Sequence, residues 1–358
     1  MPPEASRAEA QLIAPGFADR IVDWQKSHGR SELPWQNTSD PYRVWLSEVM
    51  LQQTQVSTVL GYYSRFLERC PDVAALAAAS EDEVFGLWSG LGYYSRARNM
   101  HRCAQEVVSR FGGAFPSTAA ELQTLPGIGR STAAAIAAFC FGEHVAILDG
   151  NVKRVLTRLL AFDGDLASAA QERMLWNEAT QLLPSPAREG AMPPYTQGLM
   201  DLGATVCLPR KPSCMICPVS DLCVARREGS AERYPVKTRK LRRSAQSIWM
   251  LVARDSAGRI WLEKRPARGV WAGLYCLPLF ESRDHLFDAL AQSGGTEGVT
   301  DGAAFVHVLT HKDLHLHPVF ATRASERELN AHGQWFAAIQ WQALGLPAPV
   351  RKLLSEAA

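Results

Sequence analysis

The chain has 358 residues, of which 47% are hydrophobic and 21% are charged, a composition typical of a folded globular protein rather than a disordered one. Its length allows two domains, each with a core of its own. The formal net charge of +2 neither requires nor excludes a nucleic-acid partner. The longest apolar runs are too short to span a membrane, and the N-terminal segment lacks the apolar core of a signal peptide. Both observations predict a cytoplasmic protein.

Up to about residue 230, segment after segment carries apolar residues at helical spacing. Glycine and proline separate these segments, and no β-rich run interrupts them. We therefore expect helices over residues 17–28, 40–53, 57–70, 72–80, 81–90, 95–111, 119–125, 130–141, 149–162 and 171–183.

The expected helix over 40–53 carries one carboxylate in an otherwise apolar or amide run. Asp40 suits its N-cap and Pro41 its first position, where the missing N–H of proline costs nothing. Glu48 and Gln52 are four residues apart and share a face. Two interpretations remain open at this point: a glutamate at the edge of a buried stripe, or a catalytic carboxyl group.

Two further stretches lie at the start of expected helices. Pro126–Gly129 precedes the helix over 130–141; its glycines allow a tight turn, and the N–H groups at the helix start suit a phosphate or an intervening cation. An ordinary interhelical turn is the alternative. Asp149 precedes a helix that starts near Asn151, as an N-cap or as a carboxylate at the mouth of a cleft. Lys153, Arg154 and Arg158 follow and are expected to form an edge that binds a phosphate backbone.

Four cysteines are clustered in the pattern C-x6-C-x2-C-x5-C. Thiolates at such spacing bind zinc or a [4Fe–4S] cluster. Zinc sites more often use two C-x2-C pairs, and here there is one, whereas asymmetric spacing can wrap a short coil around a cubane. The pattern predicts a metal centre on Cys207, Cys214, Cys217 and Cys223.

Basic residues dominate 226–243, which predicts either a solvated linker or a strap along a phosphate backbone. The character of the chain then changes. Two β-favouring runs joined by Asp-Ser-Ala-Gly at 255–258 predict a hairpin, and β-rich segments continue at 275–280, 305–311 and 314–322, with one helix at 284–293. We expect an α+β domain from residue 246 to the end.

Four motifs in one order, WLSEVMLQQTQV at 45–56, GLGYYSRARN at 90–99, LPGIGRSTA at 125–133 and LDGNVKRVL at 148–156, together with the cysteine pattern, resemble the MutY-type adenine DNA glycosylases. That family is a branch of the helix-hairpin-helix, or endonuclease III, superfamily. The resemblance covers nearly the whole chain and implies a multidomain protein. An all-α helix-hairpin-helix glycosylase domain over 1–227, with an iron–sulfur cluster loop, would be followed by a basic linker over 228–245. A Nudix-like 8-oxoguanine-recognition domain of α+β class would occupy 246–358.

The resemblance also divides the first domain and gives it a reaction. Residues of about 42–140 would form a six-helix-barrel module, and the N-terminal helix with 141–227 would form the iron–sulfur module. The protein would act as a monomer on double-stranded DNA, with a [4Fe–4S] cluster. It would hydrolyse the N-glycosidic bond of adenine mispaired with 8-oxoguanine or guanine in base excision repair.

By the same resemblance, Glu48 would protonate adenine at N7, with apolar neighbours raising its pKa. Asp149 would stay ionised and stabilise the oxocarbenium-like sugar, and Asn151 would help orient the attacking water. Ser131 stands where bifunctional relatives carry a Schiff-base lysine, so efficient strand cleavage is not expected.

The remaining residues carried over from the family would bind substrate or DNA. Trp35 and Tyr93 could instead be core aromatics, and Leu309 departs from the aromatic residue that relatives often have in the lesion-reading loop. The expected binding residues are Leu33 and Trp35 at adenine, Gln52 and Tyr93 beside 8-oxoguanine, Gly127, Gly129 and Lys153 at the DNA backbone, and Thr310 and His311 in the reading loop.

Two rival functions fit parts of the sequence. The first is a bifunctional pyrimidine glycosylase with lyase activity, against which Ser131 and the extra domain argue. The second is a DNA-binding scaffold without catalysis, against which Glu48 and Asp149 argue. The second domain lacks the glutamate-rich helix that a Nudix hydrolase needs for its metal, so we expect it to read a lesion rather than cleave pyrophosphates.

Overall fold

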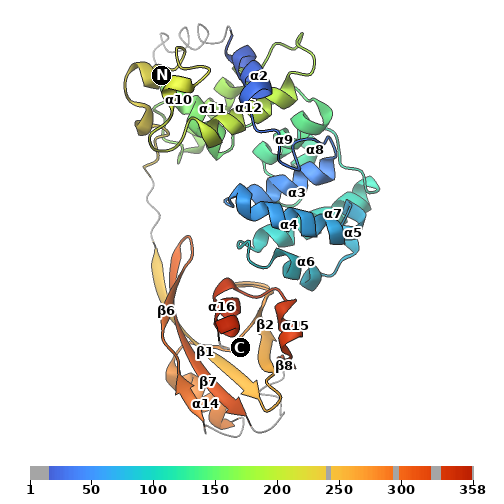
Figure 1. Cartoon of the computed structure of the whole chain (residues 1–358), viewed down its shortest axis with the longest axis vertical. Coiled ribbons are helices and arrows are strands. Elements are labelled where there is room, and N and C mark those ends of the chain that lie inside the picture. The colour runs from blue at the N-terminus through green and yellow to red at the C-terminus, as the bar shows by residue number, and fades with distance from the viewer. Residues whose placement is uncertain (1–15, 239–242, 293–297, 324–331, 357–358) are drawn as a thin grey trace. The chain divides into compact units, whose positions relative to one another are not determined.

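The computed structural model describes residues 16–238, 243–292, 298–323 and 332–356 (Figure 1). Contacts divide the chain into two compact units, each of which is made of several stretches of sequence. The first unit comprises residues 1–63, 72–74 and 102–240, and the second comprises 64–71, 75–101 and 241–358. Three basic residues of the expected linker, Arg239, Lys240 and Arg242, lie outside the described residues.

Helices build the first unit, as the sequence predicts. Their apolar faces meet in one core, to which α2, α9, α10, α11 and α12 contribute fully buried side chains. The helices of this unit are α2 (Phe17–His28), α3 (Pro41–Leu51), α8 (Ala119–Leu122), α9 (Arg130–Phe141), α10 (Gly150–Leu159), α11 (Ala169–Gln181), α12 (Met192–Thr205) and α13 (Val224–Arg227). Three helices have residues in both units: α4 (Val56–Arg69), α5 (Val73–Ala78) and α7 (Ser95–Phe111).

α12 is not among the helices expected from the sequence. Two prolines in its first turn and two internal glycines weaken the helical signal. The glycines serve packing instead: a Cβ at Gly198 would lie 2.7 Å from Ile21 Cγ2, and one at Gly203 would lie 2.6 Å from Asn151 Cβ. Close contact with α2 and with the start of α10 therefore outweighs the poor intrinsic propensity of this helix.

A mixed β-sheet forms the centre of the second unit and confirms the α+β class of the C-terminal region. Its main path runs β3-β2-β1-β7-β5, with β4 also paired to β1, β6 to β7 and β8 to β2. β1 and β7 pair in parallel along their whole length, from Ser244↔Lys312 to Asp255↔Arg323, whereas the other pairs are antiparallel. The strands are β1 (Ser244–Asp255), β2 (Ile260–Lys264), β3 (Tyr275–Cys276), β4 (Leu279–Phe280), β5 (Val299–Asp301), β6 (Phe305–Val308), β7 (Lys312–Arg323) and β8 (Gly333–Phe336).

The C-terminal region holds more helices than the sequence pattern predicts. The helix expected over 284–293 is α14 (Arg283–Gln292), with residue 293 outside the described residues. Two others were not expected: α15 (Ala338–Gln342) and α16 (Ala348–Glu356). The first is a single turn and the second begins among prolines, so neither has a long helical period. Both bury apolar side chains against the sheet. The second unit also contains α6 (Glu81–Trp88).

Candidate active site and cysteine loop

A cavity of about 1020 Å³ opens in the first unit, at the upper end of the size range of small-molecule sites. The loop after α2, the C-terminal half of α3 and the starts of α9 and α10 contribute to its wall, as does one face of α12. It brings together many of the residues expected to act on the base and sugar: Leu33, Trp35, Glu48, Gln52, Ser131, Asp149 and Asn151. Sequence reasoning missed the contribution of α12 because it missed the helix.

Glu48 reaches this cavity from the apolar face of α3. Asp40 caps the helix by accepting a hydrogen bond from Tyr42 N at 2.9 Å, and Pro41 occupies its first turn. The residues on either side of Glu48 are buried, so that protein surrounds its carboxyl group except where it faces the cavity. Desolvation raises the pKa of Glu48 to about 8, and the nearby charge of Asp149 adds to the effect. The carboxyl group therefore keeps its proton at neutral pH.

Asp149 is the N-cap of α10 and accepts a hydrogen bond from Val152 N at 2.7 Å. Burial raises the pKa of Asp149, whereas the backbone N–H groups of Val152 and Asn151 and the charges of Arg154 and Lys153 lower it. The net direction of the pKa shift of Asp149 is upward. Glu48 has none of these compensating donors among the causes of its shift, so Asp149 is the more easily ionised member of the pair.

Hydrogen bonds fix the chain on both sides of Asp149. Ser131 Oγ, at the start of α9, accepts from Leu148 N at 3.0 Å. Asn151 Oδ1 accepts from Arg154 Nη2 at 2.8 Å, and Arg154 also donates to Gly203 O at 2.6 Å. These contacts hold the carboxylate in place through neutral groups and an arginine.

The basic residues of α10 do not form the exposed edge that the sequence suggests. Arg158 is 2% exposed and donates to Leu208 O at 2.7 Å and Pro209 O at 2.9 Å, so it is not available to a phosphate. Lys153 forms an ion pair with Glu172 of α11. Arg154 and Arg158 turn inward because the loop before α13 offers them the carbonyls of Cys207, Leu208 and Pro209, a fold-level fact that charge spacing does not reveal.

The glycine hairpin joins α8 to α9. Gly127 has a positive φ of 77°, a conformation that glycine adopts at no steric cost. Ile128 and Leu125 are buried beside it, whereas a Cβ at Gly129 would meet nothing within 4 Å. The turn therefore presents bare backbone at the N-terminus of α9, where N–H groups lack intrahelical partners.

Tyr93, Thr310 and His311 belong to the second unit and do not line the cavity. Tyr93 is 48% exposed, and its hydroxyl shares a hydrogen bond with the hydroxyl of Thr310 across 2.9 Å. Arg96 lies with its guanidinium 5.6 Å from the centre of the Tyr93 ring and donates to Gly92 O at 3.3 Å. Tyr93 is thus an exposed aromatic rather than a core one.

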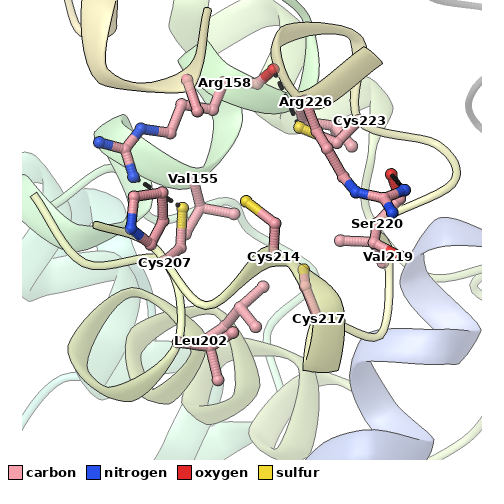
Figure 2. Close-up of a pocket in the computed structure, with 14 residues that line it drawn as sticks. Val155, Arg158, Leu202, Cys207, Cys214, Cys217, Val219, Ser220, Cys223 and Arg226 are labelled. Atoms are coloured by element: carbon pink, nitrogen blue, oxygen red, sulfur yellow. Dashed lines mark hydrogen bonds between the residues drawn. The ribbon is translucent and has the colours of Figure 1, made fainter. Parts of the chain in front are cut away.

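The four clustered cysteines line a second pocket, next to η1 (Cys214–Ile216) (Figure 2). Arg158 Nη1 lies 3.3 Å from Cys207 Sγ, and Cys223 Sγ donates to Arg158 O at 3.3 Å. Val155, Leu202 and Val219 supply apolar walls. Among the described residues, no three His, Cys, Asp or Glu side chains stand close enough to bind a single metal ion. Four thiols around one pocket supply the soft ligands that an iron–sulfur cluster takes.

Within the described ranges no helix has the length and apolar character of a membrane span. Comparisons with known families match three parts of the chain. Residues 46–179 match the HhH-GPD superfamily of base excision DNA repair proteins. Residues 207–223 match the iron–sulfur binding domain of endonuclease III, and residues 248–356 match the NUDIX domain.

Individual relatives extend this likeness along the chain. An adenine DNA glycosylase from Buchnera aphidicola subsp. Acyrthosiphon pisum is 34% identical over 342 residues, which cover 94% of this chain and 96% of the relative. The human adenine DNA glycosylase is 45% identical over 226 residues, or 61% of this chain and 40% of the human protein. The solved structure of a thermostable thymine-DNA glycosylase is 27% identical with a TM-score of 0.52, covering 63% of this chain and 99% of that structure.

Proposed function

Because this chain belongs to the adenine DNA glycosylase family, we propose that it hydrolyses the N-glycosidic bond of adenine mispaired with 8-oxoguanine or guanine. Double-stranded DNA is its substrate and a monomer its working form. The observation that carries the proposal is that two carboxyl groups with raised pKa values, Glu48 and Asp149, line one cavity that is large enough for a flipped base.

The two carboxyl groups of the cavity have different surroundings and therefore different protonation states. Glu48 is protonated at neutral pH and donates to N7 of adenine, which makes the base a better leaving group. Asp149 receives backbone hydrogen bonds and lies near two cations, so it is the carboxyl group that carries negative charge. As positive charge grows on the sugar, this carboxylate stabilises it. Water then completes hydrolysis, oriented by Glu48 and Asn151.

Strand cleavage is not part of the proposed reaction. A lyase forms an imine through a neutral amine close to C1′ of the sugar. Ser131 offers a hydroxyl instead, and that hydroxyl already accepts a hydrogen bond from Leu148 N. Lys153, the nearest lysine to Asp149 along the chain, is paired with Glu172.

The other expected residues take supporting roles in this proposal. Residues 1–227 carry out base removal, 246–358 read the lesion and 228–245 connect them. Leu33 and Trp35 line the adenine pocket, and Gln52 fills space vacated in the duplex. Gly127 and Gly129 contact the DNA backbone, whereas the ion pair with Glu172 keeps Lys153 from it. Tyr93, Thr310 and His311 recognise 8-oxoguanine.

The cysteine loop is proposed to hold a [4Fe–4S] cluster on Cys207, Cys214, Cys217 and Cys223. The cluster supplies four metal–thiolate bonds that tie the loop together. Arg158 sits at the same pocket and bonds both the loop and Cys207. Iron and sulfide analysis of protein purified without oxygen should give about four of each per chain; one zinc per chain and no sulfide would contradict the cluster.

Single-turnover assays on a duplex with one 8-oxoguanine·adenine pair test the reaction. Each sample is divided and analysed with and without hot alkali. Breaks that appear only after alkali support base removal without lyase activity. Breaks that appear equally without alkali contradict the reading of Ser131, and release of an oxidised pyrimidine instead of adenine overturns the substrate. A matched adenine·thymine duplex controls for excision from normal pairs.

A further inference from the structure

Residues 234–238 lie within the expected basic linker and are hydrogen-bonded to the rest of the first unit at three points. Arg158 Nε donates to Tyr234 O at 3.3 Å, and Leu166 N donates to Val236 O at 3.1 Å. Thr238 donates to Asp165 through both its backbone N–H, at 3.3 Å, and its hydroxyl. Residues 234–238 therefore follow a fixed path across the unit rather than a free linker path.

Lys237 lies between the last two of these anchors. Its side chain is exposed and lines the cavity that also contains Glu48 and Asp149. Because Val236 and Thr238 are both hydrogen-bonded to the 165–166 turn, the backbone of Lys237 cannot drift away from the cavity mouth without breaking those bonds.

The other two basic residues that line the cavity already have protein partners. Arg30 donates from Nε and its backbone N–H to the buried carboxylate of Asp201, at 2.7 and 2.9 Å. Arg154 donates to Asn151 and to the carbonyls of Gly203 and Cys207. Over the part of the chain that the structure describes, the ammonium of Lys237 has no ion pair or hydrogen bond.

We propose that Lys237 binds a backbone phosphate of the strand whose adenine enters the cavity, and that Asp165 positions it. This inference rests on the proposed function, since a flipped nucleotide brings its own flanking phosphates to the mouth of the pocket. An exposed ammonium at that mouth neutralises one of them and releases a counterion. Asp165 acts through Thr238 and is a positioning residue.

Removal of Asp165 is expected to change DNA affinity in the direction opposite to that usual for an acidic residue. Removing an acidic residue from a DNA-binding protein ordinarily leaves affinity unchanged or raises it, because repulsion from phosphate falls. Here the loss of Asp165 releases the segment that carries Lys237, so affinity falls. Asp163, an exposed aspartate two residues away, provides a matched control of equal charge.

The test measures affinity for a duplex with 8-oxoguanine opposite an uncleavable 2′-fluoro-deoxyadenosine, from about 50 to 200 mM salt. Lys237→Ala should bind about tenfold more weakly, with the log–log salt slope reduced by about 0.9, and Lys237→Arg should restore both. Asp165→Ala should reproduce the Lys237→Ala phenotype, and Thr238→Ala, which keeps its backbone N–H bond to Asp165, should show a smaller loss in the same direction. Combining either with Lys237→Ala should add little. Asp163→Ala should bind like wild type or more tightly.

Unchanged affinity and slope in Lys237→Ala overturn the phosphate contact. Weak binding in Lys237→Ala with normal binding in both Asp165→Ala and Thr238→Ala overturns the positioning role. Thermal unfolding shows that the variants are folded, and Thr238→Ala removes the hydroxyl bond to Asp165 while the backbone N–H bond and the 165–167 turn stay in place. If wild type releases no adenine while the binding pattern holds, the proposed reaction fails and the phosphate contact stands. If adenine release is normal and the binding pattern is absent, this inference alone fails.

Discussion

The cavity of the first unit and the Tyr93–Thr310 pair of the second place their polar groups in opposite environments. Glu48 and Asp149 are surrounded by protein, and burial raises both pKa values. Tyr93 and Thr310 are exposed, and a neutral hydrogen bond joins their hydroxyls. Burial strengthens the interaction between charges and shifts the protonation of carboxyl groups, whereas a neutral hydrogen bond between exposed hydroxyls orients the two groups. The first arrangement suits bond cleavage, and the second suits the reading of a base edge. Mutation and pH should therefore affect the two regions differently.

The largest effect is expected for Glu48→Gln. Glutamine keeps the size of the side chain but cannot donate a carboxylic acid proton, and general acid catalysis contributes about 10²- to 10⁴-fold to a rate. Single-turnover adenine release should fall by about 10³-fold, with duplex affinity nearly unchanged. A variant with more than about a tenth of the wild-type rate would show that Glu48 is not the acid.

Thermal unfolding of the same variant tests independently whether the carboxyl group of Glu48 is desolvated. The pKa of Glu48 is raised from 4.5 to about 8, so the folded state binds its proton more tightly than the unfolded state. Wild-type stability from this group is complete below pH 4.5 and is lost as pH rises toward 8. Glu48→Gln removes that loss, and its Tm should exceed that of wild type most clearly at pH 8. A lower Tm at pH 8 would mean that the carboxyl group is not desolvated.

Asp149→Asn should lower the rate somewhat less, by about 10²- to 10³-fold, the range seen when one electrostatic stabiliser is removed. Asparagine is also a good N-cap, so α10 and its hydrogen bond to Val152 N should survive. Circular dichroism checks the fold, and single-turnover excision gives the rate. Full activity in this variant would assign Asp149 to capping alone.

Glu48 and Asp149 can be selected as candidate site residues from the sequence because each lies in a local pattern. Glu48 lies in an apolar helix with a strong N-cap, and Asp149 directly precedes a helix. The four clustered cysteines can be selected for the same reason, because their spacing is a local pattern. The family matches confirm the resemblance read from these motifs. What the sequence does not reveal depends on long-range packing. The helical pattern of α12 is weakened by glycines that allow close contact with α2 and α10. Arg158 is a candidate DNA contact by sequence, but in the structure the cysteine loop covers it.

The pH dependence of the excision rate should follow the ionisation of Glu48. With a pKa of about 8, Glu48 is mostly protonated at pH 7 and loses its proton as pH rises. The single-turnover rate should be nearly flat between pH 6.5 and 7.5 and then fall about tenfold per unit above pH 8. Glu48→Gln should show no such fall. A wild-type rate that rises with pH would require a base rather than an acid at this position.

The smallest effects should come from Tyr93→Phe and Thr310→Ala, which separate the two regions most sharply. Each change removes one side of an exposed, neutral hydrogen bond, worth about 0.5 to 1.5 kcal/mol. We expect a few-fold loss of preference for 8-oxoguanine over guanine opposite adenine, independent of pH between 6.5 and 9, and little further loss in the double variant. The readout is the ratio of single-turnover rates on the two mispairs, with Tyr62→Phe, a tyrosine outside this pair, as the control. Additive losses would show that the two hydroxyls act on DNA separately, and a loss that follows the titration of Glu48 would place them in the chemistry of the cavity after all.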